Sequence, residues 1–388
     1  MRMASFDETY PCKENYRRFD RRNAAFRRAE RAGFKGYDDI SFKLGWMKKR
    51  VPGFSLIDYA FRDGAITTAK ASGSGRGVID SGLYSWSPLG VSSKPEGVPV
   101  WEGSSDEAAG VVRKAGLFYG ADDVGFCELD ERWIYSHTGD GRPIVFEDVE
   151  KGYTTEEKAV IPRSHRWVIA ITVPMDFEEM KYAPAAMNAV SSMGYSRMSA
   201  VAGSIAEFIR GIGYHAIPCG NDTAQSVPIA IQAGLGHVGR HGRLITWGRG
   251  PMVRIAKIFT DLPLSPSPIA TGGIIEFCEA CEKCVRHCPS GSIPAGPRTY
   301  EGHSESNNPG VLKWYCKADA CLAHWRASGS SCAACFRECS FTKPPGIHHD
   351  IVKWFIRNMP ALNGLWARMD DLMGYGAARD PGGYWADP

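Results

Sequence analysis

The most regular pattern of apolar positions in the chain lies between residues 184 and 212. Apolar side chains recur there at intervals of three and four residues, which is the spacing of one face of an α-helix. Gly211 and Gly213 interrupt the pattern, as glycine commonly does after the last helical turn. We therefore predict a long amphipathic helix. Its apolar stripe consists of Met187, Val190, Met198, Val201, Ile205, Phe208, Ile209 and Ile212.

Shorter patterns predict helices and strands on both sides of this helix. Helical spacing predicts a helix over 104–120, and a β-branched run predicts a buried strand over 167–173. Downstream we expect a strand at 214–218, a short helix opening near Pro228, and a hairpin of 244–247 with 253–259. The mixture indicates an α/β fold.

The first 107 residues have a weaker pattern. Residues 1 to about 50 are basic and polar with interleaved aromatic residues, which favours helical arms that pack on a larger body. Gly, Ser and Pro recur from 51 to 107, which predicts a long irregular layer. Long ordered loops often line functional sites.

Composition and charge narrow the class of protein. The 388 residues are enough for two or three domains, and 44% hydrophobic with 11% aromatic residues excludes a disordered chain. A net charge of +3 gives no indication of nucleic-acid binding. No run of eighteen apolar residues occurs, so we expect no transmembrane segment, although peripheral membrane association stays open. The arginine pairs 17–18 and 21–22 lack a following apolar stretch, so we expect a cytoplasmic protein, with an exported mature form as the alternative.

The twelve cysteines are the candidate metal ligands, because nine of them lie between Cys278 and Cys339. Such bunching late in a long chain favours metal binding over a disulfide scaffold. The run Cys278-x2-Cys281-x2-Cys284-x3-Cys288-Pro289 has the bacterial ferredoxin spacing, in which the fourth cysteine serves a second cluster. Cys12, Cys127 and Cys219 are expected to be buried thiols.

A second run supplies the ligands that a second cluster requires. Cys321 precedes Cys332-x2-Cys335-x3-Cys339, and Ser340 stands where the usual motif has proline. The crossed assignment gives Cys278, Cys281, Cys284 and Cys339 to one [4Fe-4S] cluster and Cys288, Cys321, Cys332 and Cys335 to the other. Cys316 competes with Cys321. A zinc site is the alternative, but the third cysteine after two residues and the trailing Cys-Pro favour iron and sulfur.

Two further features could serve a cofactor upstream of the cysteines. The sequence 234–239 matches GxGxxG, but it follows a short helix and runs into a strand, so a glycine turn is favoured over a dinucleotide site. Tyr195 lies on the shoulder of the long helix among small residues, which leaves room for a broad, flat group. Arg254 is a candidate cation to lower its pKa, while a core or interface role is the alternative for a single tyrosine. The neighbouring small residues are Ser191, Ser199, Ala202 and Ala206.

Several motifs together resemble the corrinoid-dependent reductive dehalogenases. They are Gly220-Asn221-Asp222, Ala233 to Arg240, Gly250 to Arg254, Phe259 to Leu264, Gly120-Ala121-Asp122, Asp130 to Trp133 and the two ferredoxin runs. The resemblance covers most of the chain and is weakest in the first 100 residues. It implies a degenerate nitroreductase-like α/β core that binds base-off cobalamin, followed by a ferredoxin-like module with two [4Fe-4S] clusters. The implied domains are 1–107 (arms and irregular layer), 108–265 (core), 266–345 (cluster module) and 346–388 (C-terminal extension).

The resemblance also implies an activity and a set of site residues. The expected reaction is two-electron removal of halide from an organohalide, with Tyr195 as proton donor, Arg254 lowering its pKa, and Asn221 holding the polar side of the pocket. The expected corrinoid contacts are Ser191, Ser199, Ala202, Gly234, Gly236, His237, Trp314 and Trp325. Partners would be the organohalide and an external donor (a ferredoxin, a flavoprotein or a membrane quinol chain). Alternatives are epoxyqueuosine reductase, which acts on tRNA, and a cluster-only electron carrier.

Overall fold

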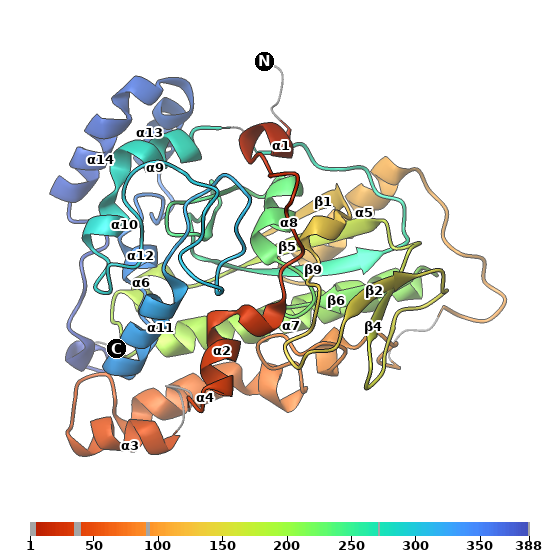
Figure 1. Cartoon of the computed structure of the whole chain (residues 1–388), viewed down its shortest axis with the longest axis horizontal. Helices are drawn as coiled ribbons and strands as arrows, with labels where there is room; N and C mark the ends of the chain where they lie inside the picture. The colour runs from red at the N-terminus through yellow and green to blue at the C-terminus, as the bar shows by residue number, and fades with distance from the viewer. Residues whose placement is uncertain (1–4, 35–39, 91–93, 271, 387–388) are drawn as a thin grey trace.

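The centre of the molecule is a four-stranded antiparallel sheet in the order β1-β5-β9-β6. The computed structural model describes residues 5–34, 40–90, 94–270 and 272–386 (Figure 1). The strands of this sheet are β1 (Asp123–Glu128), β5 (Trp167–Pro174), β6 (Ala216–Cys219) and β9 (Val253–Thr260). A second sheet has the order β2-β4-β3, formed by Ile144–Glu147, Ala159–Pro162 and Tyr153–Thr154. A third pairs β7 (His237–Val238) with β8 (Leu244–Ile245).

Both faces of the central sheet are buried, because successive side chains of a strand point to opposite faces. On one face, Ile169, Ile171 and Ile258 pack into a core shared with α5 (Ser105–Phe118) and the long helix α7 (Met187–Gly211). On the other face, Val168 and Phe259 join a larger core shared with α8 (Ser226–Gln232) and the cysteine-rich region. The sheet therefore lies between α7 and α8, while the first turn of α7 contacts the cysteine-rich region through the Ser331 hydroxyl, which donates to Asn188 Oδ1 at 2.6 Å.

Most of the predicted central elements are confirmed. Helix α7 begins at Met187 and ends at Gly211, and α5 begins after Ser104, whose hydroxyl caps the helix in a capping box with Glu107. Strand β5 coincides with the predicted buried run, β6 begins two residues later than expected, and α8 contains Pro228.

Two expectations are wrong. The predicted hairpin of 244–247 with 253–259 does not form: β8 pairs with β7, while β9 pairs with β5 and β6 in the middle of the sheet. The predicted irregular layer over 51–107 contains α4 (Leu56–Ala71), a helix of 16 residues that packs along α7. Its buried Ala65, Ile66 and Ala69 face the core.

The remaining helices are short and lie at the two ends of the chain. The N-terminal arms hold α1, α2 and α3 as expected, with residues 1–4 and 35–39 outside the described part. In Figure 1 the blue C-terminal helices lie beside the cysteine-rich segment. No helix of the described residues is both long and apolar enough to cross a membrane. The bounds are α1 (Phe6–Thr9), α2 (Ala25–Arg31), α3 (Ile40–Lys48), α6 (Phe177–Met180), α9 (Ile274–Cys281), α10 (Lys283–Arg286), α11 (Ala318–Ser328), α12 (Ala334–Arg337), α13 (Ile347–Asn358) and α14 (Asn363–Leu372), with 3-10 turns at Arg21–Asn23, Gly82–Tyr84, Glu131–Trp133, Pro360–Leu362 and Pro381–Gly383.

The packing of α7 against the sheet predicts how a substitution in this core changes the free energy of unfolding. Ile205 is fully buried between α7 and the sheet. Ile205→Ala should lower the free energy of unfolding by about 2–5 kcal/mol, because it removes buried methyl groups and leaves a cavity. The matched control is Met193→Ala on the same helix, where the side chain is 38% exposed and a change within about 0.5 kcal/mol is expected. Denaturant unfolding measures both, and equal losses would contradict the assigned packing.

Candidate active site

Three predicted residues from different elements meet at one phenol oxygen. Tyr195 on α7 accepts a hydrogen bond from Asn221 Nδ2 at 3.1 Å, and Arg254 Nη1 on β9 lies 3.4 Å from the same Oη. The guanidinium carbon of Arg254 lies 4.3 Å from the centre of the tyrosine ring. The phenol therefore faces a cation and an amide donor.

Arg254 is itself held in place from α7. Its Nη2 donates a hydrogen bond to the Ser191 hydroxyl, one turn of helix before Tyr195. Gly194 allows this approach, because a Cβ there would lie 2.9 Å from Arg254 Cγ. Arg254 Nε is buried and has no hydrogen-bond partner among the described residues. Of the predicted contacts, Ser191 thus lies beside the catalytic candidates.

A second cation comes from a part of the chain that sequence reasoning did not assign to the site. Arg76 lies with its guanidinium carbon 5.7 Å from the Tyr195 ring centre. Its loop rests directly on the Asn221 turn: a Cβ at Gly77, where φ is +105°, would lie 2.3 Å from Asn221 N. The sequence signal for such a close approach was the cluster of glycines at 73, 75 and 77. In the structure all three adopt positive φ.

These neighbours set the acidity of the phenol. Burial raises the pKa of Tyr195, but Arg254, Arg76, the hydrogen bond from Asn221, and Arg243 together bring the pKa below its ordinary value. Arg254 is the largest of the lowering influences. The phenol is therefore a better acid than an unperturbed tyrosine.

The small residues beside Tyr195 do not line an open space as expected. Ser199 and Ala202 have no exposed surface, and the Ser199 hydroxyl donates to Ser196 O within the helix. Ser196 Oγ donates to Ala65 O of the unexpected helix α4 at 2.7 Å, and Ala202 lies in the core between α7 and the central sheet. These positions favour a packing role, and the assignment of Ser199 and Ala202 as corrinoid contacts stays a prediction.

The glycine motif forms a structural turn. A Cβ at Gly234 would lie 2.2 Å from Pro268 O, and one at Gly236 would lie 2.1 Å from Ile245 O, so both glycines are required for backbone packing. His237 uses both ring nitrogens, with Nδ1 3.0 Å from Tyr10 Oη and Nε2 3.0 Å from Ala270 O. These contacts support the glycine-turn interpretation, and cofactor binding by Gly236 and His237 stays a prediction.

The two predicted aromatic walls differ in position. Trp314 is fully buried, donates from Nε1 to Gly296 O at 2.9 Å, and lies under the Arg240 guanidinium at 4.6 Å. Those contacts favour packing of Trp314 within the cysteine-rich region, and its role as a pocket wall stays a prediction. Trp325 lies on α11 with its ring centre 5.7 Å from that of Phe26.

The cysteines form two groups. A small cavity of about 20 Å³ is lined by one group, which is the first set of the crossed assignment: Cys278, Cys281, Cys284 and Cys339. Burial and nearby thiols raise the pKa of Cys284, and those thiols belong to Cys339, Cys278, Cys335 and Cys281. Among the described residues, no three His, Cys, Asp or Glu side chains are arranged to hold a single metal ion.

The second group contains both competing cysteines. Burial raises the pKa of Cys335 to about 12, Arg243 lowers it, and the thiols of Cys316, Cys332 and Cys321 raise it. Cys321 lies near Cys332 and Cys288, whereas the Cys316 thiol donates to Arg240 O at 3.8 Å. Arg243 acts electrostatically on this group and on Tyr195, so the phenol and the second cysteine group share one nearby cation.

The C-terminal extension reaches the first cysteine group. Ser340, which replaces the usual proline, has its hydroxyl 3.4 Å from Cys281 Sγ and donates to Asp370 Oδ2 at 3.0 Å. Asp370 on α14 also accepts from Lys283 Nζ at 2.8 Å. The serine thus joins α14 to the cysteine group rather than altering only a local turn.

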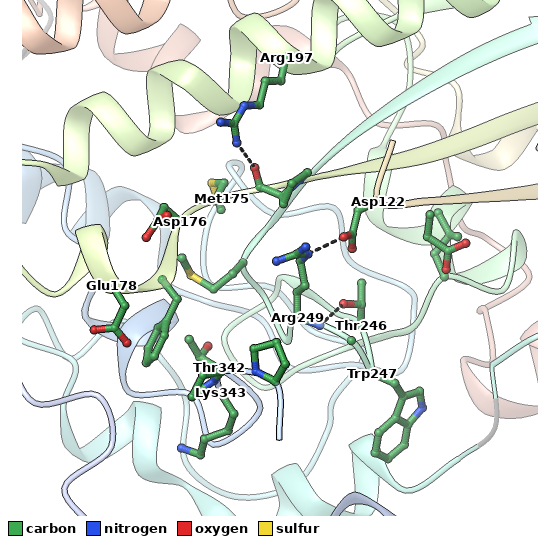
Figure 2. A pocket seen from close by; sticks show the side chains of 18 of the residues that line it. Asp122, Met175, Asp176, Glu178, Arg197, Thr246, Trp247, Arg249, Thr342 and Lys343 are labelled. Carbon is green, nitrogen blue, oxygen red and sulfur yellow. Dashed lines mark hydrogen bonds and ion pairs between the residues drawn. The ribbon is translucent and has the colours of Figure 1, made fainter. Parts of the chain in front are cut away.

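Another cavity lies away from Tyr195, which is not among its lining residues. It has a volume of about 710 Å³, and Figure 2 shows its lining between the end of β5, the 246–252 turn and residues 342–345. Two arginines in this lining already have partners. Arg249 pairs with Asp122 at 2.5 Å, and Arg197 donates to Pro174 O at 3.4 Å. Gly234 lines this cavity rather than the tyrosine site.

A smaller cavity lies between the N-terminal segment and α8. Its volume is about 250 Å³, and its lining includes Gln225 and Ser226, which follow the Asn221 turn, and Gly242 and Lys313. A Cβ at Gly242 would lie 3.5 Å from Cys316 Sγ. Neither Tyr195 nor a cysteine is among its lining residues.

The sequence of the chain is similar to those of known proteins. The sequence model of the reductive dehalogenase subunit family matches residues 16–141 and 137–264. The chain is 39% identical over 318 residues to the tetrachloroethene reductive dehalogenase of Sulfurospirillum multivorans, covering 77% of this chain and 62% of that one. An epoxyqueuosine reductase of Listeria monocytogenes is 34% identical over 67 residues, which is 17% of each chain.

The fold is also that of a solved family member. A reductive dehalogenase whose structure suggests a mechanism for B12-dependent dehalogenation superimposes with a TM-score of 0.66 at 22% identity, covering 94% of this chain and 47% of that one. The chain thus spans about six-tenths of the Sulfurospirillum relative and about half of the solved one. The match over more than half of its residues shows that this chain belongs to the reductive dehalogenase family.

Proposed function

We propose that the protein is a reductive dehalogenase that converts an organohalide to the hydrogenated product, R–X + 2e⁻ + H⁺ → R–H + X⁻. The observation that carries the proposal is the meeting of Tyr195, Asn221 and Arg254 at one phenol oxygen. A phenol whose pKa is lowered by cations is suited to deliver a proton to carbon at the moment the halide leaves.

The residues present fit the cofactors of this chemistry. Eight cysteines in the crossed grouping would hold two [4Fe-4S] clusters, as four thiolates per cluster require. The corrinoid would lie beside Tyr195 and within reach of the second cysteine group, since Arg243 acts electrostatically on both. Arg254 Nε, Asp222 Oδ1 and Tyr84 Oη are buried near Tyr195 or the Asn221 turn without partners among the described residues, so polar atoms are available to a bound group.

Each protein residue then has a defined task. Cobalamin, when bound, supplies the reduced cobalt that removes the halogen. Tyr195 holds the proton at Oη, and Arg254 stabilises the phenolate left after transfer. Asn221 donates to the same oxygen and so fixes its direction. Ser191 holds Arg254 in register with the phenol.

The proposal also includes an assignment of the domains. We assign the corrinoid core to 108–265, in nitroreductase-like form, and the ferredoxin-like module to 266–345. Residues 1–107 add Arg76 to the site, and 346–388 add Asp370 beside the first cluster. An external electron donor completes the set of partners.

The direct experiment uses anaerobically purified protein loaded with corrinoid, iron and sulfide. With a reduced viologen as donor, halide should appear from at least one aryl, alkenyl or alkyl halide. Activity on a tRNA carrying epoxyqueuosine, without halide release, would favour the alternative reductase. Absence of bound corrinoid after loading would favour a cluster-only electron carrier.

The lowered pKa of Tyr195 predicts the pH dependence. Because the protonated phenol is the donor, the rate of halide release should fall as pH rises through that pKa. Arg254→Gln removes the largest lowering influence, so the alkaline limb should move to higher pH while the maximal rate falls. Rate profiles for wild type and variant measure the shift, and coincident alkaline limbs would show that the limb does not report Tyr195.

A further inference from the structure

Strand β9 carries two cations on opposite faces. Arg254 faces α7 and reaches Tyr195. Lys257 follows three residues later and points to the other face, because side chains alternate along a strand. It has no exposed surface. A buried ammonium is costly unless it is hydrogen-bonded, so its partners show which part of the chain depends on it.

All three partners of Lys257 flank the turn that carries Asn221. The Nζ atom donates to Gly220 O, to Ala224 O at 3.1 Å and to Ser226 Oγ at 3.0 Å. Gly220 immediately precedes Asn221, whereas Ala224 and Ser226 lie beyond it. One cation therefore ties the two ends of the turn together.

The far end of the turn is fixed independently. Tyr135 N donates to Thr223 O at 3.0 Å, and Gln225 N donates to Trp133 O at 2.8 Å. Lys257 connects this anchored end to Gly220, next to the asparagine. Fixing Gly220 fixes the backbone from which the Asn221 side chain extends.

We propose that Lys257 is a positioning residue of the dehalogenase site, which holds the 220–226 turn closed so that the Asn221 amide stays 3.1 Å from Tyr195 Oη. This proposal takes the reaction, dehalogenation, from the proposed function. The positioning of Asn221 by Lys257 does not depend on it. Lys257 acts through Asn221, from the face of β9 opposite Arg254.

A double-mutant cycle tests this route. Lys257→Met should lower kcat by about tenfold to a hundredfold, the range expected for a misplaced polar group, with KM changed less than about threefold. Asn221→Ala should give a similar loss. The double variant should lie within about twofold of Asn221→Ala alone, because residues that act through one another are not additive.

A spectroscopic readout makes the test independent of turnover. Tyr195 replaced by 3-fluorotyrosine reports its own ionisation through the fluorine chemical shift. Loss of the Asn221 hydrogen bond should raise the phenol pKa. Lys257→Met should raise it equally, and the double variant should raise it no further. If the wild type released no halide, the proposed function would fail while this titration still decided the role of Lys257.

Arg210→Met is the matched control for a lost buried cation. Arg210 donates to Ser85 O and Ala216 O, both at 2.8 Å, but does not contact the 220–226 turn. It should leave the fluorine titration unchanged, and its effect on kcat should add to that of Asn221→Ala. If Lys257→Met does not fold, Lys257→Gln replaces it. Full additivity of the Lys257 and Asn221 changes, or an unshifted titration in the Lys257 variant, would overturn the proposal.

Discussion

Replacing Tyr195 by phenylalanine should reduce the rate of halide release by at least about a hundredfold, the usual contribution of a positioned proton donor. The substitution removes the one oxygen that Asn221 and Arg254 both approach. It keeps the ring over which the Arg254 guanidinium lies. Cobalt and iron contents should therefore equal those of the wild type, and anaerobic halide analysis by ion chromatography measures the loss.

Tyr214→Phe is the matched control for this change. The Tyr214 hydroxyl donates to Trp101 O at 3.1 Å, just beyond the end of α7. Its loss should change the rate by no more than about twofold, as for a surface hydrogen bond. A Tyr195→Phe variant with near wild-type halide release would assign the proton to another donor.

Loss of Cys321 should give the second large effect. We propose Cys321 as a ligand of the second cluster, so its replacement by alanine should remove that cluster. Iron should fall from about eight to about four atoms per chain. Halide release driven by reduced viologen should fall by at least about a hundredfold, since one of the two electron carriers is missing. Iron analysis and electron paramagnetic resonance of the reduced protein measure the outcome.

Cys316→Ala separates the two competing cysteines. The Cys316 thiol is engaged with Arg240 O, so its removal should leave about eight iron atoms and most of the activity. The opposite pattern, with iron lost from the Cys316 variant and kept in the Cys321 variant, would reverse the ligand assignment.

The local patterns predicted elements well where one face of an element is buried. The apolar stripe of α7 and the β-branched run of β5 were both predicted, because burial imposes their spacing directly. The pairing of β9 was not, since its neighbours β5 and β6 are distant in sequence and the adjacent segment 244–247 was the nearer partner by chain distance. Helix α4 was missed because Gly- and Ser-rich stretches surround it.

The candidate site shows the same division. Tyr195, Asn221 and Arg254 were predicted together, and the structure brings them to one oxygen. Arg76 and Lys257 were not predicted, because one comes from a loop that folds over the site and the other acts from the opposite face of a strand. Neither relation is visible in local spacing. The burial of Ser199 and Ala202 was not visible in local spacing either, because Ser196, beside Ser199, bonds to the missed helix α4 and Ala202 packs into the core between α7 and the sheet.

The central claim is that this chain couples electron supply to carbon–halogen cleavage at a protonating tyrosine. The most direct measurement is the ratio of halide released to electrons consumed by anaerobic holoprotein with verified cobalt and iron. The account predicts one halide, and one hydrogenated product, for every two electrons from the reduced viologen. Electron consumption with no halide from any aryl, alkenyl or alkyl halide would contradict it.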